Sequence, residues 1–591
     1  MSKSSTFPSP PPSSSGSIVS TSQERKSEQT SRPASNGLFL AFIISCAVVS
    51  VVNIYLHHIF HDEHVHVKAQ RDFHAVLTGT KADAPSRANK QQLQQTVRQP
   101  SSGSSSEHQL AGLKCQEKYG GPDDEFAERE MAFWSDIPSD ASYKSPFLEE
   151  GEERFLTFQP DHGGWNNIRM GMETALVLAH SMGRTLVLPP KQRFYLLNKG
   201  DSPQKNEFDF GDFFHLDSIS VEHEGLNVIT SEEFLHRLGK TGQLKNVHTN
   251  VPEIWNENNH SPQGVKTYLE KVGVNPFWDP MECVAAFPAS KGSEAISVLE
   301  EAYKNVFKNT QGKPLPKVED FDDNPTAVDA GIEERMREAM VDRPKLCMYD
   351  ENLQKAKVLY FPAQKGTRLL THFYAFVFFA DWKQDLWAKR FVRDHLRYID
   401  EIVCAAARVV EALRARSKNK DKLFDSMHVR RGDFQYKKTR LEASELIQKS
   451  QKELEEGGLL YIATDEKDKS FFKPFKEHYD IAFLDDFKHL LKGINTNYYG
   501  MLDQLVAYKG RVFFGTFRST LSGYVNRMRG YYITKHQLDG YKEGTMESYY
   551  FVPNDKRNQM KKYHAVKKPI YMCEFPISWR DIDKGVEELH Q

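Results

Sequence analysis

The chain carries the segment DHGGWNNIRMGMETALVLAHSMGRTLVLPP at residues 161–190. A strand is expected just before it, at 154–158, and the Gly-Gly turn leads into a helix with apolar residues at 168, 172, 175, 176 and 179. Gly183 ends this helix, and a second strand runs to Pro189. This pattern is typical of a βαβ unit. It predicts an α/β fold with parallel strands and a ligand-facing loop at 163–167.

A second set of strands and helices is expected in the C-terminal half. The expected strands are 426–429, 459–463, 481–484 and 511–514, and helices such as 441–456 and 499–509 lie between them. This alternation predicts another parallel sheet covered by helices. A long helix at 391–416 is expected to bridge two lobes, residues 150–390 and residues 391–591.

The N-terminal part of the chain predicts a membrane anchor. Residues 1–36 are rich in Ser and Pro, which predicts a disordered cytosolic tail. The uncharged apolar run at 37–56 is long enough to span a bilayer, and basic residues precede it. Residues 57–149 are expected to be a stem or linker. We therefore expect a single-pass type II protein whose larger part is lumenal, in the endoplasmic reticulum or Golgi.

Charge and cysteine content narrow the function classes. A net charge of −2 argues against a nucleic-acid partner bound through a general positive field. The Asp-x-Asp at 581–583 lies outside the expected strand ends, so no catalytic metal is expected. Of the 6 cysteines, Cys46 lies in the apolar run, and the other five allow two disulfides whose pairing the sequence leaves open. Cys404, in an apolar helical pattern, is expected to be the free thiol.

Two segments of the C-terminal half predict a phosphate site. SMHVRRGDF, residues 426–434, places two arginines directly after an expected strand, where α/β sheets collect ligands. On this segment alone, surface ion pairing with Asp433 is about equally plausible. RVFFGTFRSTLSG, residues 511–523, predicts a strand, a glycine turn and hydroxyl groups at a helix start. Those hydroxyls form either an anion cradle or an ordinary helix cap.

Three motifs in order resemble the GDP-fucose protein O-fucosyltransferases: the Gly-Gly-aromatic-Asn opening, the central His-x-Arg-Arg-x-Asp, and a late Asp-Gln followed by Gly-Thr-x-x-Ser-Thr. The central motif is most similar to the branch that modifies thrombospondin-type repeats. The resemblance implies a GT-B-like fold of two Rossmann-like lobes facing a cleft. It also implies inverting, metal-independent transfer of fucose from GDP-fucose to Ser or Thr of lumenal proteins. A glycan acceptor, or a catalytically dead nucleotide-sugar-binding protein, are the alternatives.

The resemblance also implies roles for individual residues. Arg430 corresponds to the family's phosphate-binding arginine, and Asp503, 12 positions before Gly515, to the acid that pairs with the guanine edge. An exposed acid in the first turn of a helix is the alternative for Asp503. Asp465 is expected near the nucleotide. The other expected donor contacts are Gly163, Gly164, Trp165, Asn166, His428, Asp433, Ser519, Thr520 and Leu521.

The catalytic base is left open by the sequence. The thrombospondin-repeat branch carries a Glu just before its Gly-aromatic-Asn, whereas this chain has Gly163 at that position. Asp161 and His162 are near enough to take its place, or the departing phosphate accepts the proton.

Overall fold

The computed structural model describes residues 113–131, 137–197, 207–308, 331–340, 343–432, 436–540, 546–551 and 557–559, with Glu574, Trp579 and Ile582. The expected tail and apolar run, residues 1–56, lie outside this part of the chain. Within the described residues, no helix is both long and apolar enough to cross a membrane.

The first βαβ unit begins a parallel sheet of four strands. The strands are β1 (Phe155–Phe158), β2 (Thr185–Leu188), β3 (Val228–Thr230) and β6 (Val358–Phe361), in the order β3-β2-β1-β6. The expected strand, helix and strand of residues 154–189 are thus confirmed. Gly183 connects helix and strand with a φ of 60°, and a Cβ there would lie 2.3 Å from the backbone nitrogen of Leu148, so a side chain is excluded.

A smaller parallel sheet belongs to the same lobe as the four-stranded sheet. It consists of β4 (Cys283–Phe287), β5 (Lys345–Met348) and β7 (Val377–Phe379), in the order β5-β4-β7. Its outer face is covered by α10 (Ser293–Lys308) and α11 (Ile332–Ala339), which pack on each other and on β4.

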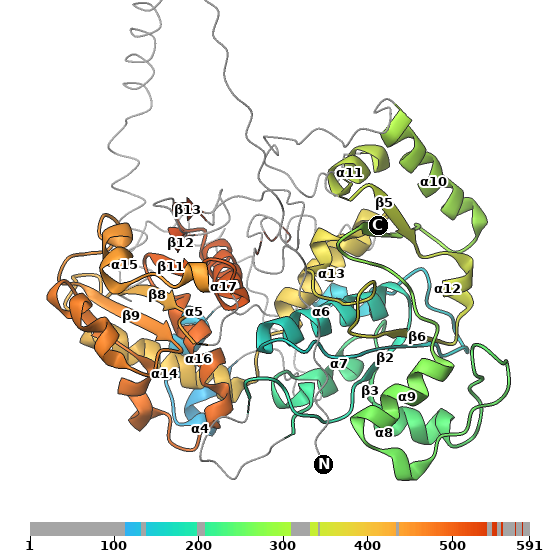
Figure 1. Ribbon diagram of the computed structural model, residues 1–591, viewed down its shortest axis with the longest axis horizontal. Coiled ribbons are helices and arrows are strands. Elements are labelled where there is room, and N and C mark those ends of the chain that lie inside the picture. The colour runs from blue at the N-terminus through green and yellow to red at the C-terminus, as the bar shows by residue number, and fades with distance from the viewer. Residues whose placement is uncertain are drawn as a thin grey trace, which may run out of the picture. The chain divides into compact units, whose positions relative to one another are not determined.

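The C-terminal sheet has six strands. They are β8 (Asp425–Val429), β9 (Leu459–Thr464), β10 (Asp480–Ala482), β11 (Phe513–Thr516), β12 (Ser548–Phe551) and β13 (Arg557–Gln559), in the order β10-β9-β8-β11-β12-β13. All neighbours are parallel except β12 and β13. Figure 1 shows β8, β9, β11 and β12 side by side. The expected parallel sheet is confirmed, so both large sheets give the chain an α/β fold.

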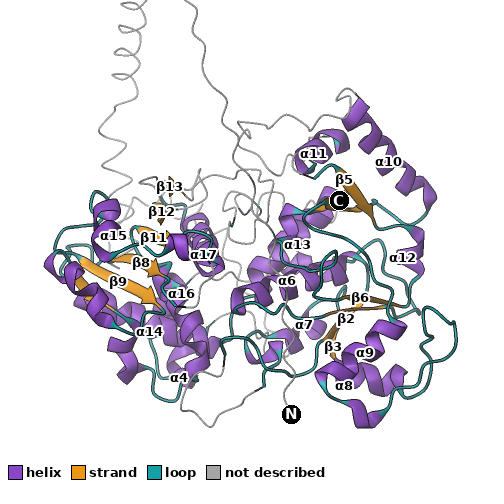
Figure 2. Ribbon diagram, in the orientation of Figure 1, coloured by secondary structure: helices purple, strands orange, loops and turns teal. Residues whose placement is uncertain are grey.

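Helices cover both faces of the large sheets, as Figure 2 shows. The remaining helices are α4 (Cys115–Tyr119), α5 (Asp124–Glu130), α6 (Trp165–Ser181), α7 (Leu216–Glu222), α8 (Ser231–Phe234), α9 (Pro262–Val272), α12 (Glu351–Lys355), α13 (Trp382–His395), α14 (Asp400–Arg416), α15 (Ala443–Ser450), α16 (Tyr499–Ala507) and α17 (Thr520–His536). Strand alternation sends side chains to both faces, so each sheet has two apolar layers. One layer of each belongs to a common core with α6, α13, α14, α16 and α17.

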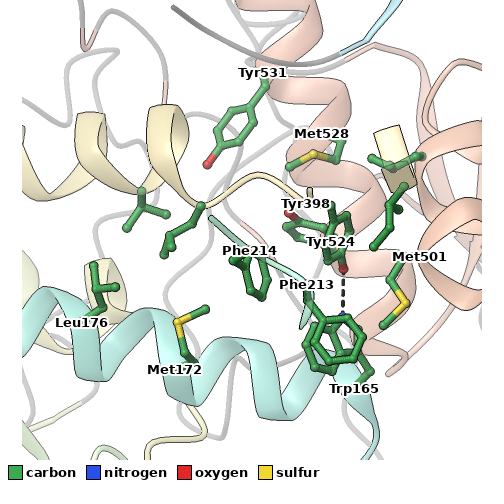
Figure 3. Packing of buried hydrophobic residues seen from close by; sticks show 14 of the residues in the cluster. Trp165, Met172, Leu176, Phe213, Phe214, Tyr398, Met501, Tyr524, Met528 and Tyr531 are labelled. Atoms are coloured by element: carbon green, nitrogen blue, oxygen red, sulfur yellow. Dashed lines mark hydrogen bonds between the residues drawn. The ribbon is translucent and has the colours of Figure 1, made fainter. Parts of the chain in front are cut away.

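This common core joins the two lobes. The ring of Trp165, at the start of α6, lies tilted against Phe213, with ring centroids 4.0 Å apart, and is stacked with Phe214 at 6.0 Å. Its indole nitrogen donates a hydrogen bond to the hydroxyl of Tyr398, and Figure 3 shows these rings together with Met501 of α16. A continuous apolar core of this kind makes the lobes one packed unit rather than two tethered ones.

The expected single helix at 391–416 is wrong. The structure has α13 ending at His395 and α14 beginning at Asp400, with Ile399 in an extended conformation (φ −54°, ψ 152°). The apolar pattern continues through this break, because Leu396 and Tyr398 are buried as well. The extended link directs Tyr398 towards Trp165, a contact that helical periodicity cannot indicate.

The expected free thiol is also wrong. Cys404 of α14 forms a disulfide with Cys115 of α4, and Cys283 of β4 pairs with Cys347 of β5. Burial in an apolar helix indicated a buried sulfur but could not tell a thiol from a disulfide, because α4 reaches α14 from 289 positions away. Cys46 and Cys573 lie outside the described residues.

A buried ion pair connects α6 with α17. Arg527 donates two hydrogen bonds to the carboxylate of Glu173, at 2.7 and 3.1 Å, and both side chains are almost fully buried. Arg169 also contacts Glu173, and Glu574 accepts from Arg527. Burial alone would raise the pKa of Glu574, but the charges of Arg527, His372 and Arg169 outweigh it and lower the value to about 2. The Glu574 carboxyl group is therefore ionised at neutral pH.

Replacing Glu173 with Gln is expected to lower the free energy of unfolding by about 3 kcal/mol or more, because Arg527 and Arg169 then lose a buried counter-charge. Glu300→Gln is the matched control. It removes an exposed i,i+4 pair with Lys304, so it should cost less than about 0.5 kcal/mol. Urea unfolding of both variants measures the difference, and equal effects would contradict the role of the buried pair.

Candidate active site

The strand order of the C-terminal sheet has one switch point. From β8 the chain continues outward through β9 and β10, whereas β11 and β12 lie on the other side of β8. Ligands of open α/β sheets bind outside the carboxyl ends of the strands at such a point. Here these ends lead into Arg430, after β8, and into Arg518, Ser519 and Thr520, after β11.

The four-stranded sheet has a corresponding switch point between β1 and β6. The chain proceeds from β1 to β2 and β3 on one side, and β6 lies on the other. Asp161 follows β1 and Arg368 follows β6. The two side chains form a two-pronged ion pair, with Arg368 Nη2 donating to Asp161 Oδ1 at 3.1 Å and its Nε donating to Oδ2.

Both switch points open into one cleft of about 440 Å³. Its lining includes the expected residues His162, Gly163, Gly164, Trp165, Asn166, Arg430, Ser519, Thr520 and Leu521. Three arginines line it, Arg368, Arg430 and Arg518, and none of the described lining residues is a carboxylate. The cleft therefore suits a ligand with several negative charges.

Two long helices begin at this cleft. Gly164 precedes α6 and has no side chain to cap it, and the side chain of Ser519 makes no capping hydrogen bond to α17. The first N–H groups of each helix thus stay available, and each helix start carries partial positive charge. Of the two alternatives for Ser519 and Thr520, this geometry favours the anion cradle.

Arg518 has a backbone conformation that is unusual for its residue type. Its φ of 65° lies in the left-handed region, and its side chain is exposed at the cleft near the ring of Tyr436. Non-glycine residues in this region are strained and are often found at ligand sites. Sequence reasoning missed Arg518, although it lies inside the 511–523 segment, and it missed Arg368, which no local motif marks.

His428 and Thr516 connect strands β8 and β11 with helix α17 next to the cleft. His428 Nδ1 lies 2.7 Å from Ser522 Oγ, and Thr516 Oγ1 donates to the carbonyl oxygen of His428 and accepts from the backbone N–H of Arg430. Burial, assisted by the charge of Arg430, lowers the pKa of His428 to about 3, so the ring is neutral. His428 therefore links β8 to α17 and does not line the cleft.

Asp465 braces the arginine loop. Its Oδ1 accepts from the backbone N–H groups of Arg431 and Gly432, at 2.7 and 3.0 Å, and its Oδ2 lies 3.1 Å from Arg430 Nε. A Cβ on Gly432 would lie 2.5 Å from Asp465 Oδ2, so this position favours glycine. Asp433 lies outside the described residues.

Asp503 is placed one turn along α16 from Gly500, which lines the cleft, but is not itself in the lining. Its Oδ1 accepts a hydrogen bond of 2.6 Å from Tyr461. Burial raises the pKa of Asp503 to about 7, although the Tyr461 hydrogen bond and the charge of Lys469 lower it.

The candidate bases differ in their surroundings. The carboxylate of Asp161 is held by Arg368 and also accepts from the N–H of Gly163 at 2.6 Å. His162 is exposed and lines the cleft. A Cβ at Gly163 would lie 2.3 Å from Asn167 Nδ2, so a Glu at that position would require this loop to rearrange.

The sequence matches the GDP-fucose protein O-fucosyltransferase family over residues 155–532, well over half of the chain. The chain belongs to this family. The match begins at β1 and ends in α17, so it includes both switch points and the entire cleft between them. A comparison with curated proteins found no match.

Solved structures similar to this fucosyltransferase-family chain include three proteins. POFUT1 in complex with GDP-fucose has 14% identity and a TM-score of 0.30, covering 68% of this chain and 98% of that one. NodZ α-1,6-fucosyltransferase soaked with GDP-fucose has 12% identity and a TM-score of 0.30, covering 64% of this chain and 92% of that one. A point mutant of Arabidopsis thaliana FUT1 in complex with GDP has 10% identity and a TM-score of 0.30, covering 81% of this chain and 87% of that one. Scores this low add nothing to the family assignment.

In this family member, Arg518→Gly is expected to raise stability and weaken anion binding together. Glycine removes about 1 kcal/mol of left-handed strain, while loss of the cation should weaken GDP binding about tenfold. Gln537→Gly is the matched control, because Gln537 has a φ of 49° at the other end of α17. It should gain stability with unchanged GDP affinity. Thermal unfolding and calorimetry measure both quantities. An Arg518→Gly protein with unchanged GDP affinity would remove Arg518 from the site.

Proposed function

We propose that the chain is an inverting O-fucosyltransferase that transfers fucose from GDP-fucose to Ser or Thr hydroxyls of lumenal proteins. The observation that carries this proposal is the cleft where two uncapped helix starts and three arginines meet. A diphosphate suits such a site because its oxygens accept from N–H groups and arginine forks. In this GT-B-like arrangement, residues 391–591 bind the donor and residues 150–390 receive the acceptor.

The leaving group is stabilised mainly by Arg430. As the bond between fucose C1 and the β-phosphate oxygen breaks, negative charge grows on that phosphate. The guanidinium of Arg430, at the end of β8, stabilises this charge. Ser519, Thr520 and the first N–H groups of α17 bind further phosphate oxygens. Side chains and helix starts supply this positive charge, so the proposed reaction is metal-independent.

The acceptor hydroxyl attacks C1 from the opposite side and loses its proton. His162 is the proposed base among the protein groups, because it is exposed on the cleft whereas Asp161 is engaged by Arg368. The β-phosphate of the departing GDP is the other acceptor for this proton. Asp161 then serves to hold the 161–167 loop in place.

The membrane setting is part of the same proposal. The uncharged run at 37–56, preceded by basic residues, supports a type II signal anchor that holds the enzyme in the endoplasmic reticulum or Golgi. The two disulfides suit an oxidising lumen.

The full-length protein is expected to release GDP from GDP-fucose and to fucosylate a protein acceptor, and Arg430→Lys should lower this rate about a hundredfold to a thousandfold. Lysine keeps the charge but loses the fork of donors. Arg431→Lys is the matched control, because Arg431 contacts Glu466 and Phe471 away from the cleft. It should retain most activity.

A folded Arg430→Lys enzyme with near-normal turnover would refute the role of Arg430. Wild-type protein that binds GDP without turnover on protein or glycan acceptors would indicate a catalytically dead binding protein. Transfer to glycans alone would indicate the alternative acceptor class.

GDP binding is expected to strengthen as the pH rises through about 7, because Asp503 must be ionised to accept two guanine N–H bonds. Below that pH, the contribution of Asp503 to GDP affinity should weaken about tenfold per pH unit. The raised pKa also means that Asp503 stabilises the fold at low pH and that this contribution is lost as the pH rises through 7. Calorimetry from pH 5.5 to 8.5 on wild type and Asp503→Asn isolates this group. Identical pH profiles would exclude Asp503 from the guanine contact.

A further inference from the structure

Four buried side chains form a hydrogen-bonded relay that begins and ends on the first turn of α6. Trp165 Nε1 lies 3.0 Å from the Tyr398 hydroxyl, which lies 3.1 Å from Gln504 Oε1, and Gln504 Nε2 lies 2.8 Å from Asn166 Oδ1. Gln504 is fully buried and Tyr398 nearly so. The relay leaves α6 at Trp165, passes through the α13–α14 link and α16, and returns at the adjacent residue, Asn166.

The indole and the buried hydroxyl together set the direction of the bonds in this relay. A tryptophan N–H can only donate, so the Tyr398 oxygen accepts from it. Among the described residues, the other hydrogen-bond partner of this buried hydroxyl is Gln504 Oε1, which therefore accepts its hydrogen. The amide nitrogen of Gln504 must then face Asn166 Oδ1. Amide orientations are assigned from such networks, and this network admits one. Burial raises the pKa of Tyr398, so the hydroxyl keeps its proton at neutral pH.

The consequence appears at the cleft. Because Asn166 Oδ1 is occupied by Gln504, the Nδ2 group of Asn166 is the part of its amide left for a ligand, and Asn166 lines the cleft beside the start of α6. A donor there suits phosphate or sugar oxygens, whereas the reversed amide would present an oxygen to an anionic ligand.

We propose that Tyr398 and Gln504 are positioning residues that hold the Asn166 amide with its donor towards the nucleotide-sugar. Neither residue touches the ligand. This inference rests on the proposed function, because it takes GDP-fucose as the ligand of the cleft. It gives the Gln of the Asp-Gln motif a role separate from that of Asp503, its neighbour in the sequence.

The test is a double-mutant cycle on GDP affinity, measured by calorimetry with the full-length protein at pH 8. Gln504→Glu keeps the size of the side chain. Above the pKa of the new carboxyl group, which burial raises, the carboxylate cannot donate to Asn166 Oδ1, so the Asn166 amide must reverse. We expect about tenfold weaker GDP binding from this single change. In an Asn166→Ala background, the same change should alter GDP affinity less than about twofold, because the two residues act as one unit.

The pH profile gives a second signature. When the carboxyl group introduced by Gln504→Glu is protonated, it has one accepting oxygen and one donating O–H, which restores the polarity of the relay. The GDP affinity of this variant, divided by that of wild type at the same pH, should therefore rise towards one as the pH falls, and the Asn166→Ala background should show no such change. A merely structural role predicts no dependence on Asn166.

Tyr398→Phe is the second variant if Gln504→Glu does not fold, as judged by circular dichroism. It removes the group that sets the orientation of Gln504, so its loss of GDP affinity should also vanish in the Asn166→Ala background. If the fold-loss of GDP affinity from either variant multiplies with the fold-loss from Asn166→Ala, the relay is overturned and the proposed function stays intact. A folded wild-type protein that binds no GDP would overturn the proposed function, and the relay with it.

Discussion

The bidentate ion pair between Glu173 and Arg527 is the contact on which the cleft depends. Glu173 lies eight residues beyond the start of α6, and Arg527 lies seven beyond the start of α17, roughly two turns into each helix. Buried charges are costly unless they are paired, so this geometry strongly favours one arrangement of the two helices. Both helix starts then meet at the cleft.

The positive charge of the cleft follows from this arrangement and from the two strand orders. A parallel sheet directs the loops at its strand ends to one edge, and each large sheet places an arginine at its switch point. Asp161 is the first residue of the 161–167 loop, and Arg368 holds its carboxylate. Asp465 stands behind Arg430 and orients it. Acidic side chains thus orient the arginines, which remain the charged groups lining the cleft.

The proposed reaction requires the cleft to bind the transition state, in which the bond to the phosphate is breaking, more tightly than it binds the intact donor. Fixed N–H groups and guanidinium forks need no reorganisation when charge moves onto the phosphate, which is the usual source of large rate effects.

The larger cavity, about 860 Å³ at the carboxyl ends of β2 and β3, contains none of the residues expected from the sequence to bind a ligand. Size alone therefore does not identify the site.

Local pattern predicted the parts of the molecule that local forces determine. The 154–189 unit and strands β8, β9 and β11 follow from periodicity, and Arg430 follows from its place after a strand. The break between α13 and α14, the partner of Cys404 and the roles of Arg368 and Arg518 depend on contacts between distant segments. An apolar pattern cannot show that Tyr398 turns towards Trp165, because the residues on both sides of the break are equally buried.

The most direct test of the central claim is a crystal structure of the protein with GDP-fucose. The account predicts the diphosphate between the starts of α6 and α17, with β-phosphate oxygens within hydrogen-bonding distance of Arg430 and of the first N–H groups of α17. A diphosphate bound in the cavity beside β2 and β3, or in the cleft without contact to Arg430, would contradict it.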